Sequence, residues 1–447
     1  METPIWDFAR QYAGSGKLRL HMPGHKGSKV LGVEDLDLTE IEGADVLYQA
    51  QGIIGRSEEN AAALFGTAKT VYSTEGSSLG IRAMLYLAML YGRQMGKKPR
   101  ILAGRNAHKT FMTAAALLDL EVLWLYPKEG EGILSCRITE EGLEQTLAQM
   151  EEKPVAVYLT NPDYLGNLVD IRGLSRVCHR HGVLLLVDNA HGAYLRFLPQ
   201  SCHPMDLGAD LCCDSAHKTL PVLTGGAYVH ISKAAPSCFC QQIERAMALF
   251  ASTSPSYLIL QSLDKVNAYL AEGYPQRLAA FAESLAAMKQ RLKDRGIPPV
   301  GEEPLKLTLA PKHLGYTGTE LAQLLWKQDM VCEFSDPDYV VMMLTPELGQ
   351  ESLVRIEQAL SAIEKREPIL QQAPPLPPPV RKRSIREALL SPARELPLRQ
   401  CLGRILADAS VSCPPAIPIV VCGEEITLDS IACFEYYGIT HCRVMER

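Results

Sequence analysis

Two short runs of consecutive apolar residues constrain the fold of this chain more than any other feature. Val155–Leu159 and Val183–Val187 are apolar throughout, and residues 174–181 between them have helical spacing and are followed by Gly182. Strands that are apolar on both faces are typical of a parallel sheet covered by helices. The sequence therefore predicts an α/β fold with a mainly parallel central sheet, in which ligands bind beyond the carboxyl ends of the strands.

Other patterns indicate how the chain is organised around that sheet. Similar apolar runs extend it at Ile101–Ala103, Val122–Leu125 and Ala227–Ile231. A helical pattern over 256–295, with a break near 273–275, is followed by a small α+β domain, with strands expected at Lys306–Leu309, Val331–Phe334 and Tyr339–Leu344 and helices at Thr319–Gln328 and Ser352–Lys365. A proline-rich segment followed by basic residues is typical of a semi-rigid linker. We therefore expect an N-terminal arm (1–30), a major domain (31–260), a small α+β domain with its linking helix (261–367), a linker (368–383) and a C-terminal module (384–447).

Composition narrows the functional classes. The 447 residues carry a formal net charge of −6, which disfavours a nucleic-acid binder. The longest apolar stretch, Ala83–Tyr91, is half of what a membrane span needs, and residues 1–10 lack the apolar core of a signal peptide. Thirteen cysteines without a C-x-x-C pair indicate reduced thiols. We expect a soluble cytoplasmic protein with neither nucleic acid nor membrane as a partner.

Three polar segments near the predicted strands have the residue types of a binding site. Ser73–Gly80 leads into an apolar helix, and small residues at a helix start favour an anion; a serine helix cap is the alternative. Arg105–Lys109 contains His108, which can stack on a planar ring or move a proton, although a lone histidine is more often a packed polar residue. Thr160–Asn167 is either a ligand-binding turn or an ordinary Asn-Pro turn.

Two further segments contain a carboxylate and an amine in apolar surroundings. Asp188 ends a run of buried apolar residues and needs a cationic partner, which can be a metal, an arginine or a protonated heterocycle nitrogen. Asp188 and His191 make a poor metal site because no third ligand is near in sequence, so we expect no metal. Lys218 precedes the apolar Leu220–Leu223, and desolvation favours the free amine of Schiff-base chemistry. A surface lysine is the alternative.

Together these segments supply what pyridoxal 5'-phosphate (PLP) needs. The cofactor requires an anion site for its phosphate, a group against its ring, a carboxylate for its pyridine nitrogen and a lysine amine. The order of these segments along the chain also matches the aminotransferase-like fold of many PLP enzymes.

Seven motifs in order make the chain resemble the short form of the ornithine/lysine/arginine decarboxylases. The motifs lie at His21–Gly27, Asp37–Asp45, Asn106–Lys109, Asp188–Gly192, Ser215–Leu220, Ser252–Tyr257 and Pro414–Pro418 with Gly423–Glu424. The resemblance implies PLP-dependent decarboxylation of arginine, lysine or ornithine to the amine and carbon dioxide.

The resemblance also implies roles for individual residues. Lys218 is the residue that binds the cofactor covalently, Asp188 is the partner of the pyridine nitrogen, and His108 stacks on the ring. Further cofactor contacts are expected from Gly76, Ser77, Ser78, His191, Ser215, His217, Thr253 and Ser254. Thr253 or Ser254 is expected to reach the site of the opposite subunit, which implies a homodimer or higher homo-oligomer with shared active sites. His108, His217 or Lys218 returns a proton to Cα.

For the basic end of the substrate, the resemblance offers Asp45 and Glu40, and a solvated acidic loop is the alternative. The chain departs from the family pattern at Glu75 (usually Asn), Asn189 (Glu), Gly225 (Gln), Cys413 (Tyr), Ala416 (Gly) and Cys422 (Pro). None of these removes a group that the cofactor needs, but they leave the substrate open. The competing functions are an aminotransferase or another lyase on the same fold and a non-catalytic regulatory protein. Retention of Asp188, His108 and Lys218 disfavours the regulatory protein.

Overall fold

The computed structural model describes residues 1–128, 131–409 and 416–446. The chain forms two compact units: unit 1 comprises Met1–Gly96 with Ile171–Leu278, and unit 2 comprises Lys97–Asp170 with Ala279–Arg447. The second boundary falls inside the long helix Tyr274–Asp294 (α11). The division into five parts expected from the sequence stays a prediction.

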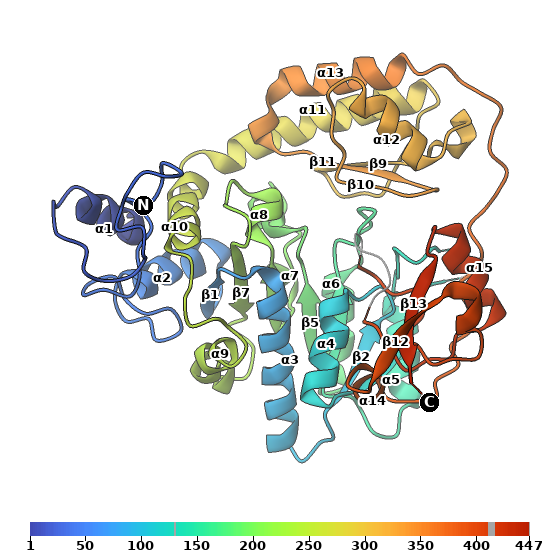
Figure 1. Cartoon of the computed structure of the whole chain (residues 1–447), viewed down its shortest axis with the longest axis horizontal. Helices are drawn as coiled ribbons and strands as arrows, with labels where there is room; N and C mark the ends of the chain where they lie inside the picture. Colours follow the sequence, from blue (N-terminus) through green and yellow to red (C-terminus); the bar gives the residue numbers. More distant parts are fainter. Residues whose placement is uncertain (129–130, 410–415, 447) are drawn as a thin grey trace. The chain divides into compact units, whose positions relative to one another are not determined.

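Unit 1 contains a sheet portion with the strand order β1-β7-β6-β5, in which β5 and β6 are parallel. Its strands are Lys69–Ser73 (β1), Leu184–Asp188 (β5), Leu211–Asp214 (β6) and Ala227–Ile231 (β7). Its helices are Pro4–Ala13 (α1), Ile53–Phe65 (α2), Gly76–Gln94 (α3), Ile171–Arg180 (α6), Pro204–Leu207 (α7), Ala216–Thr219 (α8), Cys238–Ala248 (α9) and Tyr257–Ala271 (α10), with a 3-10 turn at Ala193–Phe197. The long helix α3 packs across these strands (Figure 1).

One strand runs opposite to expectation. The sequence predicts that Ala227–Ile231 extends the parallel sheet, but β7 is antiparallel to both of its neighbours, β1 and β6. A parallel connection usually needs a covering helix to return the chain to the starting edge. Between β6 and β7 the chain forms only the four-residue helix α8, so β7 starts from the edge where β6 ends.

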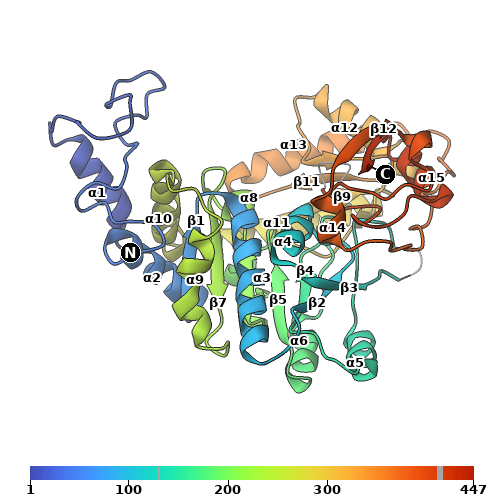
Figure 2. The same cartoon turned by 60° about the horizontal axis from the view of Figure 1, so that its bottom comes forward.

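The N-terminal helix of unit 1 packs on α2 and α10. Figures 1 and 2 show the three helices side by side. The carboxylate of Asp264, on α10, accepts hydrogen bonds from the backbone N–H groups of Ile5 and Trp6 at 2.9 Å each and from the Ser57 hydroxyl at 2.6 Å. The carboxylate therefore caps the start of α1 and ties it to the unit.

Unit 2 contains a parallel group of strands in the order β4-β2-β3, an antiparallel sheet β10-β11-β9-β8 and a two-stranded ribbon. Its strands are Arg100–Gly104 (β2), Glu121–Leu125 (β3), Ala156–Thr160 (β4), Pro299–Val300 (β8), Lys306–Leu309 (β9), Phe334–Ser335 (β10), Val340–Met343 (β11), Ala393–Pro397 (β12) and His441–Met445 (β13). Its helices are Lys109–Leu118 (α4), Glu140–Gln149 (α5), Gly318–Trp326 (α12), Gly349–Ser361 (α13), Ile385–Leu389 (α14) and Leu428–Tyr436 (α15), with 3-10 turns at Pro311–Leu314, Pro346–Leu348 and Leu398–Cys401.

The strands and helices expected between residues 306 and 365 match the structure except at one strand, and the short strand β8 was not expected. Of the expected Val331–Phe334, only Phe334 is in a strand, where it pairs with Val341 of β11. Val331 is 76% exposed and lies outside β10, so its apolar character did not indicate burial. Within the described part of the chain, no helix has the length and apolar character of a membrane span. Each described cysteine is a free thiol.

Candidate active site

Three strands of unit 1 end at one edge of the sheet. The register pairs Ser73 of β1 with Ala227, Asp214 of β6 with Tyr228, and Asp188 of β5 with Cys213. The carboxyl ends of β1, β5 and β6 therefore lie level. The segments that follow them are those that the sequence singled out: Ser73–Gly80, Asp188–Gly192 and Asp214–Leu220.

The start of α3, where the sequence predicts an anion site, contacts the segment after β6. Ser215 is 1% exposed, and its hydroxyl donates to the Ser77 hydroxyl at 2.8 Å. The backbone N–H of Gly76 donates to the carbonyl of Gly225 at 2.7 Å. Two hydroxyls, with Ser78 one residue further, thus lie at the positive end of a 19-residue helix, an arrangement suited to a phosphate.

The amine of Lys218 lies beside the turn that follows β5. Its Nζ is 2.9 Å from Nε2 of His191, whose side chain is buried. The backbone N–H of Lys218 donates to the carbonyl of Ser215 at 3.0 Å. The predicted covalent lysine, the predicted carboxylate turn and the anion site are therefore brought together within unit 1.

The carboxylate of Asp188 is buried at the end of β5. Asp188 is 2% exposed, and its Oδ1 accepts a hydrogen bond from the backbone N–H of Ala190 at 3.2 Å. A buried carboxylate is stable only with hydrogen bonds or a cation. A protonated pyridine nitrogen is such a cation.

The proton of the His217 imidazole is placed by its neighbour. Its Nδ1 lies 2.9 Å from the carbonyl oxygen of Gly226. Because a carbonyl only accepts hydrogen bonds, Nδ1 carries the hydrogen. In the neutral ring, Nε2 is then the basic nitrogen.

His108 belongs to unit 2, where it caps the start of α4. Its Nδ1 accepts a hydrogen bond from the backbone N–H of Thr110 at 3.2 Å. The next residue, Lys109, donates its backbone N–H to the carbonyl of Ala416 at 2.8 Å. The ring is therefore anchored at the carboxyl end of β2, and its stacking on the cofactor stays a prediction.

A buried arginine ties the C-terminal module to the His108 segment. Arg105 is 5% exposed, and its guanidinium donates to the carbonyls of Pro418 at 2.6 Å and Ile419 at 2.8 Å. The carboxylate of Glu424 lies 4.0 Å from the same guanidinium. Contacts on both sides of His108 thus come from the terminal module, a role that the sequence did not predict.

The predicted contacts Thr253 and Ser254 lie in an exposed segment of unit 1. Ser252, at its start, donates its backbone N–H to the carboxylate of Glu75 at 2.8 Å in the same chain. Glu75 directly precedes α3, so this departure from the family pattern ties the segment to the anion site.

Asp45 is one of the two predicted substrate carboxylates, and in the structure it accepts hydrogen bonds from backbone N–H groups. Its side chain accepts hydrogen bonds from the N–H groups of Val46, Gln51, Gly52, Ile54 and Gly55 at 2.8–3.3 Å, which caps the start of α2. Burial opposes ionisation, but these N–H groups outweigh it and hold the pKa of Asp45 below its ordinary value. This geometry favours a structural role for Asp45, whereas Glu40 is exposed.

The backbone accounts for the departure at Gly225 but not for the one at Ala416. Gly225 has φ +101°, and a Cβ there would lie 2.8 Å from the carbonyl oxygen of Thr74, so a glutamine would push the β7 side away from the anion site. Ala416 has φ +58°, in the left-handed region that favours glycine. Cys422 is buried, with its thiol 3.9 Å from the carbonyl of Ile385. Cys413, Pro414 and Pro415 lie outside the described residues.

The Asn-Pro turn after β4 uses its polar groups internally. Asn161 Oδ1 accepts the N–H of Val169 at 2.8 Å, and Asp163 accepts from Leu165 and Asn167. This arrangement favours the ordinary turn over the ligand-binding one.

A group that the sequence did not predict lies behind the site. His203, Asp214 and His230 are each fully buried, and both histidine Nε2 atoms bond Oδ2 of Asp214, at 2.9 and 3.2 Å. Nδ1 of His203 accepts the N–H of Met205 at 3.3 Å, so Nε2 carries the hydrogen and points it at the carboxylate, an arrangement that disfavours a metal there. Burial raises the pKa of Asp214, but the two histidines outweigh it and lower that pKa. No sequence signal joins residues so far apart.

The residues of unit 1 fit PLP in the chemistry of their donors. The hydroxyls of Ser77 and Ser215 and the start of α3 suit a dianionic phosphate. Lys218 offers the amine, and Asp188 is a buried acceptor for a protonated ring nitrogen.

Comparison with known proteins places the chain in a family. The model of the Orn/Lys/Arg decarboxylase major domain matches residues 3–296. The chain is 29% identical over 468 residues to an arginine decarboxylase of Bacillus subtilis, covering 96% of this chain and 92% of that protein.

Solved structures confirm the predicted α/β, aminotransferase-like fold. The lysine decarboxylase of Francisella novicida has a TM-score of 0.78 at 16% identity and covers 99% of this chain and 81% of its own. The constitutive lysine decarboxylase of Escherichia coli has a TM-score of 0.77 at 18% identity, and the match covers 100% of this chain and 82% of the lysine decarboxylase chain. With its family model spanning most of the chain and its site residues at the ends of β1, β5 and β6, the protein belongs to the Orn/Lys/Arg decarboxylase family.

Proposed function

We propose that the protein is a PLP-dependent decarboxylase that converts a basic amino acid (arginine, lysine or ornithine) into its amine and carbon dioxide. One observation carries the proposal: the Lys218 amine lies 2.9 Å from His191, on the turn that begins with the buried Asp188, in a member of this decarboxylase family. The free cysteines fit a cytoplasmic location, where thiols stay reduced.

Each of the predicted site residues in unit 1 has a distinct role in this chemistry. When bound, PLP supplies an electron sink for the electrons that remain after carbon dioxide leaves. Asp188 would stabilise a proton on the ring nitrogen, because it is a buried carboxylate at the end of β5. Ser77, Ser78 and Ser215 bind the phosphate at the start of α3. Lys218 would hold the cofactor through its side-chain amine.

A proton must return to Cα after carbon dioxide leaves. Lys218 and Nε2 of His217 are the candidates from unit 1, and His108 is the candidate from unit 2. For the basic end of the substrate, Glu40 is the available carboxylate of the two predicted, since Asp45 is bound by five backbone N–H groups.

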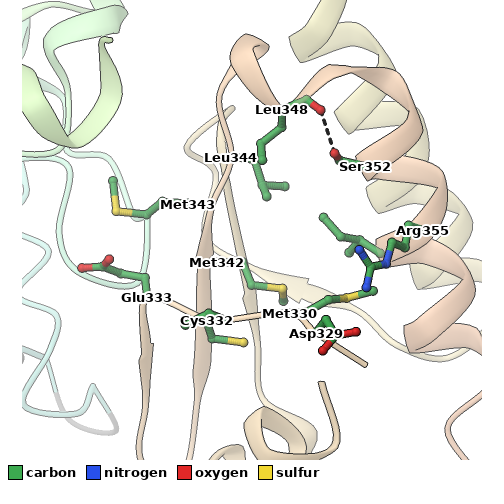
Figure 3. Close-up of a pocket in the computed structure, with 12 residues that line it drawn as sticks. Asp329, Met330, Cys332, Glu333, Met342, Met343, Leu344, Leu348, Ser352 and Arg355 are labelled. Carbon is green, nitrogen blue, oxygen red and sulfur yellow. Dashed lines mark hydrogen bonds between the residues drawn. The ribbon is translucent and has the colours of Figure 1, made fainter. Parts of the chain in front are cut away.

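The small domain disfavours the aminotransferase alternative. Aminotransferases commonly clamp the substrate carboxylate with an arginine of that domain. Arg355, on α13, lines a hollow of about 440 Å³ (Figure 3). Its guanidinium donates to the carbonyl of Gln328 at 2.5 Å. Apolar side chains form much of that hollow, namely Met330, Val331, Met342, Met343, Leu344, Leu348 and Ile356.

We propose a homodimer in which Thr253 and Ser254 complete the site of the partner subunit. The resemblance supports this arrangement, and both residues are exposed and so available to a second copy. The Lys218→Ala variant and a Thr253→Ala/Ser254→Ala variant would then carry their defects in different composite sites. Mixing the two inactive proteins should restore roughly a quarter of the parental activity, since about half of randomly formed dimers are mixed and each has one intact site. No recovery despite confirmed subunit exchange would mean that the segment acts within its own chain.

The proposed reaction is tested with purified protein and PLP. Incubation with arginine, lysine and ornithine separately should release carbon dioxide and the matching amine from at least one of them. Omission of PLP from protein stripped of cofactor should abolish release. Absence of both turnover and a cofactor absorbance band would support the regulatory protein instead.

A further inference from the structure

The turn 188–192 holds two residues of the proposed site, Asp188 and His191. Asn189, which follows Asp188 in this turn, is held by hydrogen bonds to its surroundings. Asn189 is fully buried. Its backbone N–H donates to the carbonyl of Cys213 at 2.9 Å, and its carbonyl accepts the N–H of Gly192 at 2.8 Å. The position of the turn therefore depends on how Asn189 is held.

The side chain of Asn189 is held by Asp214. Its Nδ2 donates to Oδ1 of Asp214 at 2.7 Å. The orientation of the amide is determined, because a carboxylate only accepts hydrogen bonds. The other carboxylate oxygen accepts from His203 and His230, and the thiol of Cys212 lies 3.4 Å from Oδ1. The two histidines thus bind one oxygen of the Asp214 carboxylate, and the other oxygen binds the side chain of Asn189 in the turn.

Burying the side chain of Asn189 costs stability, which argues that this residue has a functional role. Among the described residues, no group bonds the Oδ1 atom of Asn189, although it is buried, and such an atom is destabilising. A Cβ at Gly192 would lie 2.0 Å from the same oxygen, so only glycine fits opposite this amide. A carboxylate at position 189, as in the usual family pattern, would face the carboxylate of Asp214 without a proton between them.

We propose that Asn189 and Asp214 are a matched pair of positioning residues that holds Asp188 and His191 in place for the cofactor. In this proposal, both act on the cofactor through the turn 188–192. The inference rests on the proposed function, and it accounts for the departure from the family pattern at position 189.

An exchange of the two side chains tests the pair. Asn189→Asp places two carboxylates 2.7 Å apart and should weaken PLP binding by about tenfold or more, as expected for neighbouring residues that depend on each other. Asp214→Asn loses either the histidine bonds or the Asn189 bond and should weaken binding as well. The double variant restores an amide opposite a carboxylate, and its oxygen at position 214 still accepts from both histidines. It should recover most of the affinity.

The readouts are the dissociation constant for PLP, the fraction of Lys218 fixed to the cofactor by borohydride, and the melting temperature of the protein without PLP. Asp210→Asn is the matched control. Asp210 is buried just before β6, at the opposite end of that strand, where its Oδ2 accepts from His179 at 3.0 Å and from the N–H of Leu185 at 2.8 Å. This control should lower the melting temperature and leave PLP affinity within about twofold of the parent.

Each outcome decides the inference. Recovery of affinity in the double variant supports the pair, and so does a double variant that folds where Asn189→Asp alone does not. Additive losses in affinity, or a loss in Asp210→Asn as large as in Asn189→Asp, would overturn the positioning role while leaving the proposed function intact. A parent protein that binds no PLP would overturn both.

Discussion

Replacement of Lys218 by alanine should remove covalent cofactor binding and lower decarboxylase activity by roughly a thousandfold or more. The reason is local: Lys218 supplies the amine beside His191 at the edge where β5 and β6 end. The visible absorbance of bound PLP should disappear, and borohydride reduction should no longer fix the cofactor to the protein.

Peptide mapping of the parent after reduction identifies the residue directly. The adduct should lie on Lys218. Lys109 is the matched control, because it follows His108 as Lys218 follows His217, and Lys109→Ala should leave the adduct in place. An adduct on Lys109 or Lys26 would refute the assignment.

Replacement of Asp188 by asparagine should leave PLP binding largely intact but lower turnover by about a thousandfold, or about 4 kcal/mol of barrier. The amide has nearly the shape of the carboxylate but cannot stabilise a proton on the pyridine nitrogen. The electron sink is therefore weakened without loss of the phosphate contacts at Ser77 and Ser215.

Titration of the Asp188→Asn protein with PLP separates binding from turnover. Affinity should stay within a few-fold of the parent while single-turnover release of carbon dioxide slows. Activity within a few-fold of the parent would contradict the role of Asp188, and a loss of affinity equal to the loss of activity would instead indicate a binding role.

The parts of the fold that the sequence predicted are those governed by local patterns. The run Val183–Val187 became β5 at Leu184–Asp188, and the break near Gly273 separates α10 from α11. Asp188 ends β5, and the segments with Glu75 and Lys218 closely follow the ends of β1 and β6. The chain leaves the buried sheet at these points, so polar motifs follow apolar runs and could be recognised from the sequence. Such features depend on residues close in sequence.

The parts that were missed depend on contacts between distant residues. The direction of β7 follows from how little helix lies between it and β6, not from its own residues. The bond between Asn189 and Asp214, and the contacts of Arg105 with Pro418 and Ile419, join segments that no periodicity connects. Asp45 has the residue type of a substrate ligand, yet its oxygens are occupied by the backbone at the start of α2.

The central claim is that the protein removes the carboxyl group of a basic amino acid and keeps its α-nitrogen. The most direct measurement uses arginine, lysine and ornithine labelled isotopically at both the carboxyl carbon and the α-nitrogen, incubated with the PLP-loaded protein. Mass spectrometry should find the carbon label in carbon dioxide and the nitrogen label in the amine product, in equal amounts, and neither product with Lys218→Ala. A keto acid that retains the carbon label and has lost the nitrogen label would identify an aminotransferase and contradict the account.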